Sequence, residues 1–382
     1  GVRRWPDGTI LPHTLGFTGP VTAEQWPAAR AQGLAMDATI GQNGLEAAYD
    51  TLLRGRDGQL QINVGLDGVT RETMQTSTPV PGCTLVLTLD ADLQKTLQTA
   101  LQNQMDTLRT TKGIGAGREV RAGAAVVVDV RTGGILAAAS LPDFDLSRYR
   151  SDYAALSADN AAPLLDRVCQ GLYAPGSAFK PAVAAAALTA GIDPAATVNC
   201  TGKYFYYSNY HPGCLQYGHR GPVDLRTALE YSCNIFFYDT GRRLGVDTFS
   251  AMARQLGLAN DTGVEITAAQ GRLTWSTDTN YQDRLTLMAA IGQGNTAVTP
   301  LQLAQYAATL ANYGRKPTLH FADRAVQPAT GAAVWQYEPA FTEIPGGKAV
   351  FGPIRDGMKR MAQTARALRE APVTVAAKTG SP

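Results

Sequence analysis

The sequence predicts an α+β fold in which helices cover an antiparallel sheet, with a loop-rich module that contains strands in front of it. Two apolar runs, 124–129 and 134–140, are joined by Arg131-Thr132-Gly133, a typical hairpin turn. Residues 181–375 have a largely helical pattern, with Ala-rich segments and Gly stops. The apolar run 373–377 predicts a buried strand that returns to the sheet. Strands, helices and a returning strand in this order are typical of an α+β or α/β sandwich.

The N-terminal part differs in its pattern. Gly and Pro interrupt short segments throughout residues 1–115, which favours a loop-rich module with strands. Its clearest elements are a β-branched strand at 84–89 and an amphipathic helix that Asp90 or Asp92 caps. A Gly-rich basic stretch, 111–123, is typical of a linker. We therefore predict an N-terminal module, residues 1–115, and a second domain, residues 116–382.

Composition limits the function further. The 382 residues are enough for two domains, and 45% of them are hydrophobic. A net charge of +2 gives no reason to expect a nucleic-acid partner. No apolar run reaches the roughly 20 residues that a membrane-spanning helix needs. Because the sequence begins at Gly1 without a signal-peptide pattern, we expect an excised or processed piece of a longer protein.

Three short motifs carry the chemistry. The first is Ser177-Ala178-Phe179-Lys180, which precedes an Ala-rich run and is therefore predicted at a helix N-terminus. Residues three apart on a helix lie one turn apart on the same face, so the Lys180 amine is expected within reach of the Ser177 hydroxyl. A lysine can accept a proton only when neutral, which burial or a neighbouring cation favours.

The other two motifs supply groups that suit the same cleft. Ser232-Cys233-Asn234 opens an aromatic-rich segment and places a hydroxyl and an amide at a predicted helix start. Lys378-Thr379-Gly380 follows the predicted strand 373–377, where a glycine lets a ligand approach the backbone and the lysine supplies a charge. Each motif alone is also typical of a solvated helix face or a turn. Together they predict nucleophilic acyl transfer.

The set Ser-x-x-Lys, Ser-x-Asn and Lys-Thr-Gly resembles the signature of penicillin-binding proteins and serine β-lactamases. The surrounding runs 173–181 and 126–145 resemble the nucleophile segment and opening strands of class B penicillin-binding proteins. Residues 44–50 and 53–58 are similar to the non-catalytic, dimerisation-like pedestal of the elongation (rod-shape) subgroup. The resemblance covers nearly the whole chain.

The resemblance implies a peptidoglycan D,D-transpeptidase that β-lactams acylate. Ser177 would attack the penultimate D-Ala carbonyl of a stem peptide, and Lys180 would accept its proton. Ser232 would relay a proton to the leaving amine, steered by Lys378. The resemblance assigns the remaining positions to substrate binding: Asn234 to the substrate amide, Thr379 and Ser381 to its carboxylate, Gly380 to the third motif, and the N–H groups of Ser177 and Ser381 to the oxyanion hole.

The resemblance also implies a location and partners. It places the catalytic domain on the extracytoplasmic side of a bacterial membrane, with the anchor outside this chain. The expected partners are a SEDS-family glycan polymerase and other elongation proteins, besides stem peptides and β-lactams. Two departures stand out. The family has Thr where this chain has Ser381, which keeps the hydroxyl and the N–H. The family's sheet continues beyond the third motif, so we expect the chain to be C-terminally incomplete.

Other functions share parts of this pattern. A β-lactamase or a β-lactam sensor domain would carry the same motifs, but neither has a place for the N-terminal module. A non-catalytic scaffold that binds glycan or protein partners is a third alternative. It would have no use for the intact set of Ser177, Lys180, Ser232 and Lys378. A labelled penicillin discriminates these alternatives: a long-lived adduct, rapid turnover or no adduct.

A cysteine-rich segment lies between the first and second motifs. Cys200, Cys214, His219 and Cys233 have the spacing Cys-x13-Cys-x4-His-x13-Cys, and such soft or borderline ligands suit a closed tetrahedral Zn²⁺ site. His211 is an alternative ligand, and some members of the family carry a similar cluster. A Cys200–Cys214 disulfide and plain buried thiols are the competing interpretations. The acyl-transfer chemistry itself requires no cofactor.

Overall fold

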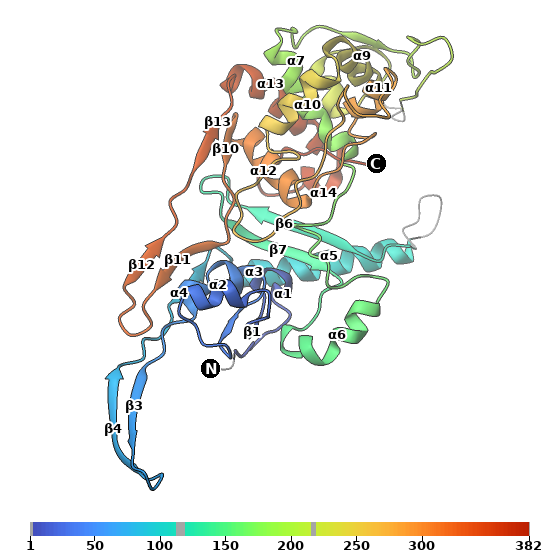
Figure 1. Cartoon of the computed structure of the whole chain (residues 1–382). Coiled ribbons are helices and arrows are strands. Elements are labelled where there is room, and N and C mark those ends of the chain that lie inside the picture. The colour runs from blue at the N-terminus through green and yellow to red at the C-terminus, as the bar shows by residue number, and fades with distance from the viewer. Residues whose placement is uncertain (1–2, 112–118, 215–218, 382) are drawn as a thin grey trace.

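The computed structural model describes residues 3–111, 119–214 and 219–381. The N-terminal module is built from short pieces around one small antiparallel pair, β1 with β2 (Figure 1). Its elements are α1 (Pro12–Leu15), β1 (Thr18–Pro20), α2 (Trp26–Ala31), β2 (Thr39–Gly41), α3 (Gly44–Ala48) and α4 (Asp50–Leu53). The frequent Gly and Pro residues explain these lengths, because both interrupt regular backbone. The predicted loop-rich module is therefore confirmed, with more short helices than the sequence indicated.

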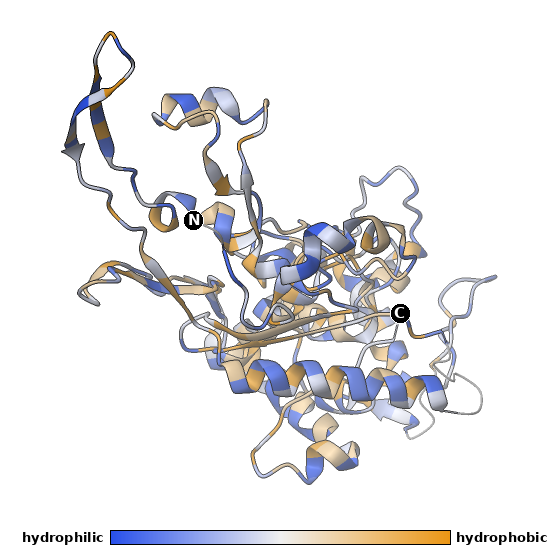
Figure 2. Cartoon of the chain, turned by 90° about the horizontal axis from the view of Figure 1, so that it is seen from below, coloured by the Kyte–Doolittle hydropathy of each residue, from blue (hydrophilic) through white to orange (hydrophobic). Residues whose placement is uncertain are grey.

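A long hairpin projects from this module. It consists of β3 (Gln59–Val64) and β4 (Thr70–Ser77), whose residues are all exposed. Figure 2, seen from below, shows it reaching away from the body at the upper left, with hydrophobic and hydrophilic stretches mixed along it. An isolated two-stranded hairpin is at best marginally stable in water.

The middle of the molecule confirms the elements predicted around the two opening strands. These elements are β5 (Thr84–Leu87), α5 (Ala91–Thr110), β6 (Gly123–Val128) and β7 (Ile135–Leu141). Asp90 caps α5, because its carboxylate accepts from the N–H groups of Asp92 and Leu93 at 3.0 and 2.9 Å. The buried Gln94 amide of α5 donates to the Ala138 carbonyl at 2.7 Å and accepts from the Ala138 N–H at 2.8 Å. These two bonds attach α5 to β7. Most of the predicted linker 111–123 lies outside the described residues.

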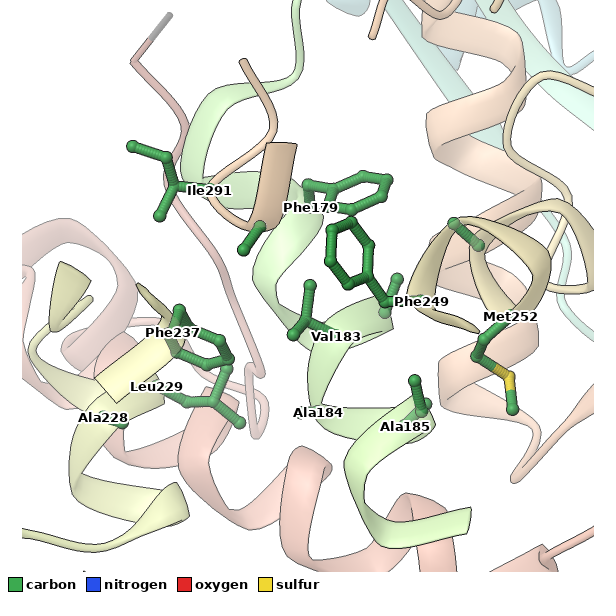
Figure 3. Packing of buried hydrophobic residues seen from close by; sticks show 14 of the residues in the cluster. Phe179, Val183, Ala184, Ala185, Ala228, Leu229, Phe237, Phe249, Met252 and Ile291 are labelled. Carbon is green, nitrogen blue, oxygen red and sulfur yellow. The ribbon is translucent and has the colours of Figure 1, made fainter. Parts of the chain in front are cut away.

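A helical body forms the upper part of the molecule in Figure 1. It follows η1 (Leu146–Arg148) and α6 (Tyr149–Ala158), and its elements are η2 (Gly176–Phe179), α7 (Lys180–Thr189), β8 (Val198–Cys200), β9 (Gly221–Val223), α8 (Leu225–Glu230), α9 (Asn234–Leu244), α10 (Val246–Gln255), α11 (Leu285–Ala290), α12 (Pro300–Ala311), α13 (Gly347–Thr364) and α14 (Arg366–Arg369). Helix α7 is its centre, with every residue from Lys180 to Ala187 buried. Figure 3 shows Val183, Ala184 and Ala185 of α7 among neighbouring helices, and Phe179 against Phe249. Their rings meet edge to face at 6.2 Å between centroids.

The predicted helical stretch also contains strands. Besides β8 and β9, they are β10 (Arg315–Pro317), β11 (Ala322–Val326), β12 (Ala333–Gln336) and β13 (Phe341–Glu343). β10 pairs with β13, and β11 pairs with β12 and also with the distant β5, giving the order β12-β11-β5. The sequence prediction missed these strands because each is short, and the pairing of β11 with β5 depends on residues over 200 positions away.

The prediction of a returning strand at 373–377 is wrong. None of these residues belongs to a strand or forms a ladder with any strand in the described ranges, and Val373 is 69% exposed. One backbone bond, from the Ala377 N–H to the Met358 carbonyl of α13 at 3.0 Å, holds the segment. The third motif therefore follows an irregular segment instead of a sheet strand.

Candidate active site

The nucleophile candidate lies in a single turn of 3-10 helix. Ser177 is the second residue of η2, and the α-helix proper begins at Lys180, with Pro181 in its first turn as expected. Gly176 precedes it with φ 53°, and a Cβ there would lie 2.5 Å from the Ser381 carbonyl oxygen. Only glycine fits this position, so the turn that presents Ser177 packs directly on the backbone of the third motif.

Lys180 is completely buried in the middle of the three motifs. Its ammonium group donates to the Ser232 carbonyl at 2.7 Å, to Ser232 Oγ at 3.1 Å and to Asn234 Oδ1 at 2.6 Å. Burial first, and then the positive charge of Lys378, lower the pKa of Lys180 to about 7. Ser177 Oγ forms no hydrogen bond with Lys180 in the structure. The charged amine has used its three donors, so it can turn to Ser177 only as the neutral base.

Ser232 connects the two lysines. Its hydroxyl lies 2.9 Å from Lys378 Nζ and 3.1 Å from Lys180 Nζ, and both ammonium groups donate to it. Ser232 has φ 54°, a left-handed conformation that costs energy in a residue other than glycine. This backbone turn ends just before α9, whose first residue is Asn234. The predicted helix start is therefore confirmed, and it aims the hydroxyl and the Asn234 amide at the same amine.

Lys378 and its neighbours complete the group from the opposite side. Lys378 is half-buried, and burial lowers its pKa to about 8. Gly380 of the third motif packs closely on the nucleophile turn. A Cβ on Gly380 would lie 2.4 Å from the Pro175 carbonyl oxygen. The third motif and the nucleophile turn thus fit together through two glycines, Gly176 and Gly380.

Two residues that line the cleft, Ser177 and Ser381, have backbone N–H groups without a partner among the described residues. The nucleophile turn is also held from behind, where the Gly176 N–H donates to the Gly292 carbonyl at 3.0 Å. Backbone donors that are already fixed in place suit a developing oxyanion, because they need no reorganisation during the reaction.

These groups line one open cleft of about 450 Å³. Its lining includes Ser177, Ser232, Asn234, Thr379 and Ser381, and adds residues that sequence reasoning missed: Asn209, Tyr210, His211, Pro212, Gly213, Tyr238, Met288, Ile291 and Gln293. Two glycines with positive φ, Gly292 and Gly294, flank Gln293. That Gly-Gln-Gly turn was the one local signal for this wall. The remaining residues reach the cleft only through tertiary packing.

The predicted metal-ligand set comes together beside the cleft. Cys200, Cys214, His219 and Cys233 are all buried, and one ligand atom from each lies within 4.8 Å of every other. Cys214 Sγ is 3.7 Å from His219 Nε2. Cys200 forms no disulfide with any described cysteine. His211 instead lines the cleft, away from the four, with its ring 4.9 Å from that of Phe205.

The donor chemistry fits a cation. The Cys214 contact, followed by burial, raises the pKa of the Cys233 thiol, because crowded buried thiols resist ionisation without a positive charge. His219 Nδ1 is buried and has no hydrogen-bond partner in the described chain. Three thiols and an imidazole in such close contact are the donor set that Zn²⁺ prefers in structural sites.

Comparison with known families covers most of the chain. Residues 123–381 match the penicillin-binding protein transpeptidase domain, and residues 1–87 match the penicillin-binding protein dimerisation domain.

Individual relatives agree with these matches. The chain is 28% identical to peptidoglycan D,D-transpeptidase MrdA of Salmonella typhimurium, over 99% of this chain and 62% of that protein. It is 29% identical to MrdA of Acinetobacter baumannii, over 99% of this chain and 56% of that one. The chain therefore spans less than two thirds of the length of these curated relatives.

Solved structures show the same fold. A chain from a peptidoglycan synthase complex that coordinates polymerization and crosslinking has a TM-score of 0.82 and 31% identity, over 99% of this chain and 66% of that one. PBP2 of Pseudomonas aeruginosa has a TM-score of 0.76 and 27% identity, over 99% of this chain and 80% of that one.

Proposed function

Because this chain belongs to the family of penicillin-binding proteins with a dimerisation and a transpeptidase domain, we propose that it is a peptidoglycan D,D-transpeptidase of cell elongation. The predicted resemblance to class B penicillin-binding proteins is confirmed. The observation that carries the proposed activity is the meeting of Lys180 and Lys378 at Ser232 Oγ, in the cleft that Ser177 also lines. A β-lactamase or a sensor domain would not need the dimerisation domain that residues 1–87 match. A non-catalytic scaffold would not need a buried lysine whose pKa is lowered.

In the proposed acylation, neutral Lys180 accepts the Ser177 hydroxyl proton while Ser177 Oγ bonds to the penultimate D-Ala carbonyl carbon. The oxyanion that forms faces the N–H groups of Ser177 and Ser381. The carbon–nitrogen bond then breaks. The leaving amine of the terminal D-Ala takes a proton from Ser232, which the protonated Lys180 replaces. Lys378, Thr379 and Ser381 hold the substrate carboxylate, and Asn234 holds a substrate amide.

The second half of the reaction reverses these roles. An amine from a neighbouring stem peptide attacks the ester carbon, and neutral Lys180 accepts a proton from that amine. The carbon–oxygen bond to Ser177 breaks, and Ser177 recovers its proton from Lys180. The product is a new amide cross-link, with no net change of protons on the enzyme.

Peptide mass spectrometry after treatment with benzylpenicillin tests the nucleophile. We expect a stable adduct on the peptide that carries Ser177, and none in the Ser177→Ala variant. An adduct on Ser232, or one that persists in Ser177→Ala, would contradict the mechanism. Rapid release of penicilloate by the wild type would indicate a β-lactamase instead.

The location and partners follow from the proposed function. None of the described helices is long and apolar enough to cross a membrane. We propose that the domains act on the extracytoplasmic face of a bacterial membrane, beside a SEDS-family glycan polymerase and other elongation proteins. The related chain from a synthase complex supports the pairing with a polymerase. We keep the division into residues 1–115 and 116–382 as part of this proposal.

The cysteine cluster supports a second, structural proposal. Cys200, Cys214, His219 and Cys233 would hold one Zn²⁺, whose role is to bring the ends of three segments together. Cys233 separates Ser232 from Asn234, and Cys214 follows Gly213, whose carbonyl accepts from Asn234 at 3.2 Å. These residues would therefore keep the second motif in place.

Metal analysis of protein purified without added zinc tests this site, together with thiol counting under denaturing conditions. We expect one zinc per chain and five titratable thiols, and a lower melting temperature after chelation. The Cys200→Ser variant should lose the metal, whereas Cys83→Ser, outside the cluster, should retain it. Two missing thiols without metal would show a disulfide and end the proposal.

A further inference from the structure

A second cavity adjoins the active-site cleft. It has a volume of about 260 Å³ and is lined by Tyr210, Asn280, Gln282, Arg284, Leu285 and Met288. Tyr210 and Met288 also line the cleft, so the two hollows share one wall. In that wall, the Tyr210 hydroxyl donates to Met288 Sδ at 3.1 Å. The cavity therefore continues the cleft on the far side of Tyr210 and Met288.

The position of this cavity relative to the reacting groups is well defined. Arg284 precedes α11 with helical backbone angles and lies four residues before Met288, so both side chains lie on the same face. In the shared wall, Tyr210 belongs to the loop whose Gly213 carbonyl accepts a hydrogen bond from the Asn234 amide at 3.2 Å. Arg284 therefore lies beyond the residue to which we assign the substrate amide. A substrate held by Asn234 can continue along α11 into the cavity.

The charge of the cavity comes from Arg284. Its guanidinium forms no ion pair or hydrogen bond with other residues that the structure describes, and its neighbour Asp283 does not line the cavity. The Asp278 carboxylate does not line the cavity, and it accepts from Asn295 Nδ2 at 2.7 Å and from the Trp275 N–H at 3.0 Å. An arginine with its donors available, beside the amide of Gln282, is suited to bind a carboxylate through two parallel hydrogen bonds.

We propose that this cavity is a subsite for a carboxylate carried by the stem peptide, and that Arg284 binds it. The proposal rests on the transpeptidase function proposed above. The carboxylate is distinct from the terminal one assigned to Thr379 and Ser381, because those residues line the cleft and not this cavity. It belongs to a residue further along the peptide. Donor and acceptor peptides carry the same chemistry, so the experiment separates them.

Matched peptides test the subsite. In the donor arm, pentapeptides ending in D-Ala-D-Ala have either a free or an amidated side-chain carboxylate at the third residue, and D-alanine release is measured. In the acceptor arm, tetrapeptide amines differ in the same way, and cross-linked product is measured by mass spectrometry. The wild type should prefer the free carboxylate in one arm by about 10-fold, the size of a charge-assisted contact.

The variants decide the assignment. Arg284→Gln should bring the preference to about one, and Arg284→Glu should reverse it in favour of the amide. Arg30→Gln, an exposed arginine on α2, loses the same charge far away and should keep the wild-type preference. The arm that shows the effect identifies the peptide. A wild type that does not distinguish the peptides, or an Arg284→Gln variant that slows both equally, overturns the subsite alone. No penicillin adduct on the wild type overturns the transpeptidase function and the subsite together.

Discussion

At the scale of single residues, the site depends on two lysines that share one hydroxyl. Ser232 Oγ accepts from Lys180 and Lys378, so both of its lone pairs are used and its own proton points elsewhere. In the proposed mechanism, the leaving amine takes that proton. Burial, and then the positive charge of Lys378, lower the pKa of Lys180 below that of Lys378, which burial alone lowers. One lysine can then act as a base while the other stays charged.

The two lysine pKa values predict a narrow pH optimum for acylation by benzylpenicillin. Lys180 must be neutral, so the rate should rise with pH through about 7. Lys378 must be charged, so the rate should fall again above about 8. Stopped-flow acylation rates against pH, in protein shown to stay folded, measure both limbs. A rate that keeps rising well above pH 8 would remove the requirement for a charged Lys378.

Replacing Lys378 with alanine tests the second role directly. We expect acylation to slow by about 100-fold, the size of a lost electrostatic contact in a cleft. The melting temperature should change little, because the side chain is half-buried and its contacts are Ser232 Oγ and the Thr379 carbonyl. Lys359→Ala on α13 provides a control for loss of one lysine. Acylation by Lys378→Ala at the wild-type rate would exclude Lys378 from the site.

At the scale of elements, the position of α9 against α11 controls the shape of the cleft. α9 begins with Asn234 and α11 carries Met288, and both residues line the cleft. The two helices touch at Gly241, where a Cβ would lie 2.5 Å from the Ala290 Cβ. A helix interior normally prefers alanine to glycine. Here the closeness of the two helices requires glycine.

An alanine substitution at Gly241 and one at an exposed helix position should therefore have opposite effects. Gly241→Ala must push α9 from α11, and we expect it to lower the free energy of unfolding by about 1–3 kcal/mol and to slow acylation. Asn103→Ala, at an exposed position of α5, should raise the free energy of unfolding by about 0.5 kcal/mol, because alanine has the higher helix propensity. Urea unfolding and penicillin acylation measure both. A stabilising Gly241→Ala would mean that α9 and α11 are not in fixed contact.

At the scale of the whole molecule, one carboxylate connects three distant parts. Glu265 Oε1 accepts from the Tyr49 hydroxyl at 3.1 Å and from the Ala322 N–H at 2.9 Å, and both of its oxygens accept from Phe321. Tyr49 belongs to the N-terminal module, while Phe321 and Ala322 lead into β11, which pairs with β5. Burial, followed by the Glu265 charge, raises the pKa of Tyr49. Glu265 thus links the module to the catalytic domain.

Removing the Glu265 hydrogen bonds should destabilise the contact between the N-terminal module and the catalytic domain. The loss should grow with the number of hydrogen-bond donors left without an acceptor. Glu265→Ala leaves two backbone N–H groups without an acceptor, and each costs about 1–3 kcal/mol. Tyr49→Phe removes a single hydrogen bond and should cost about 0.5–1.5 kcal/mol. Thermal unfolding with limited proteolysis between residues 44 and 90 measures the difference. Equal effects of the two variants would show that this contact does not depend on the carboxylate.

The sequence by itself determined the local elements and the chemistry of the site. The hairpin of β6 and β7, the cap at Asp90, the helix starts near Lys180 and Asn234, and the three motifs all depend on neighbours a few residues apart. Such short-range preferences can be predicted from the residues in a single segment. The four candidate zinc ligands were also predicted from spacing, and the structure brings all four together.

Only the tertiary structure decided what depends on distant partners. The strands β10–β13 were missed, and the strand at 373–377 was wrong, because a strand exists only where another strand pairs with it. The close packing of Gly380 on the Pro175 carbonyl had no signal in the sequence. Nothing in the sequence indicated a role for Arg284. The proposed role depends on a cavity that adjoins the cleft, with Tyr210 and Met288 lining both. Residue order specifies which groups are present, whereas packing over long sequence separations decides which of them meet.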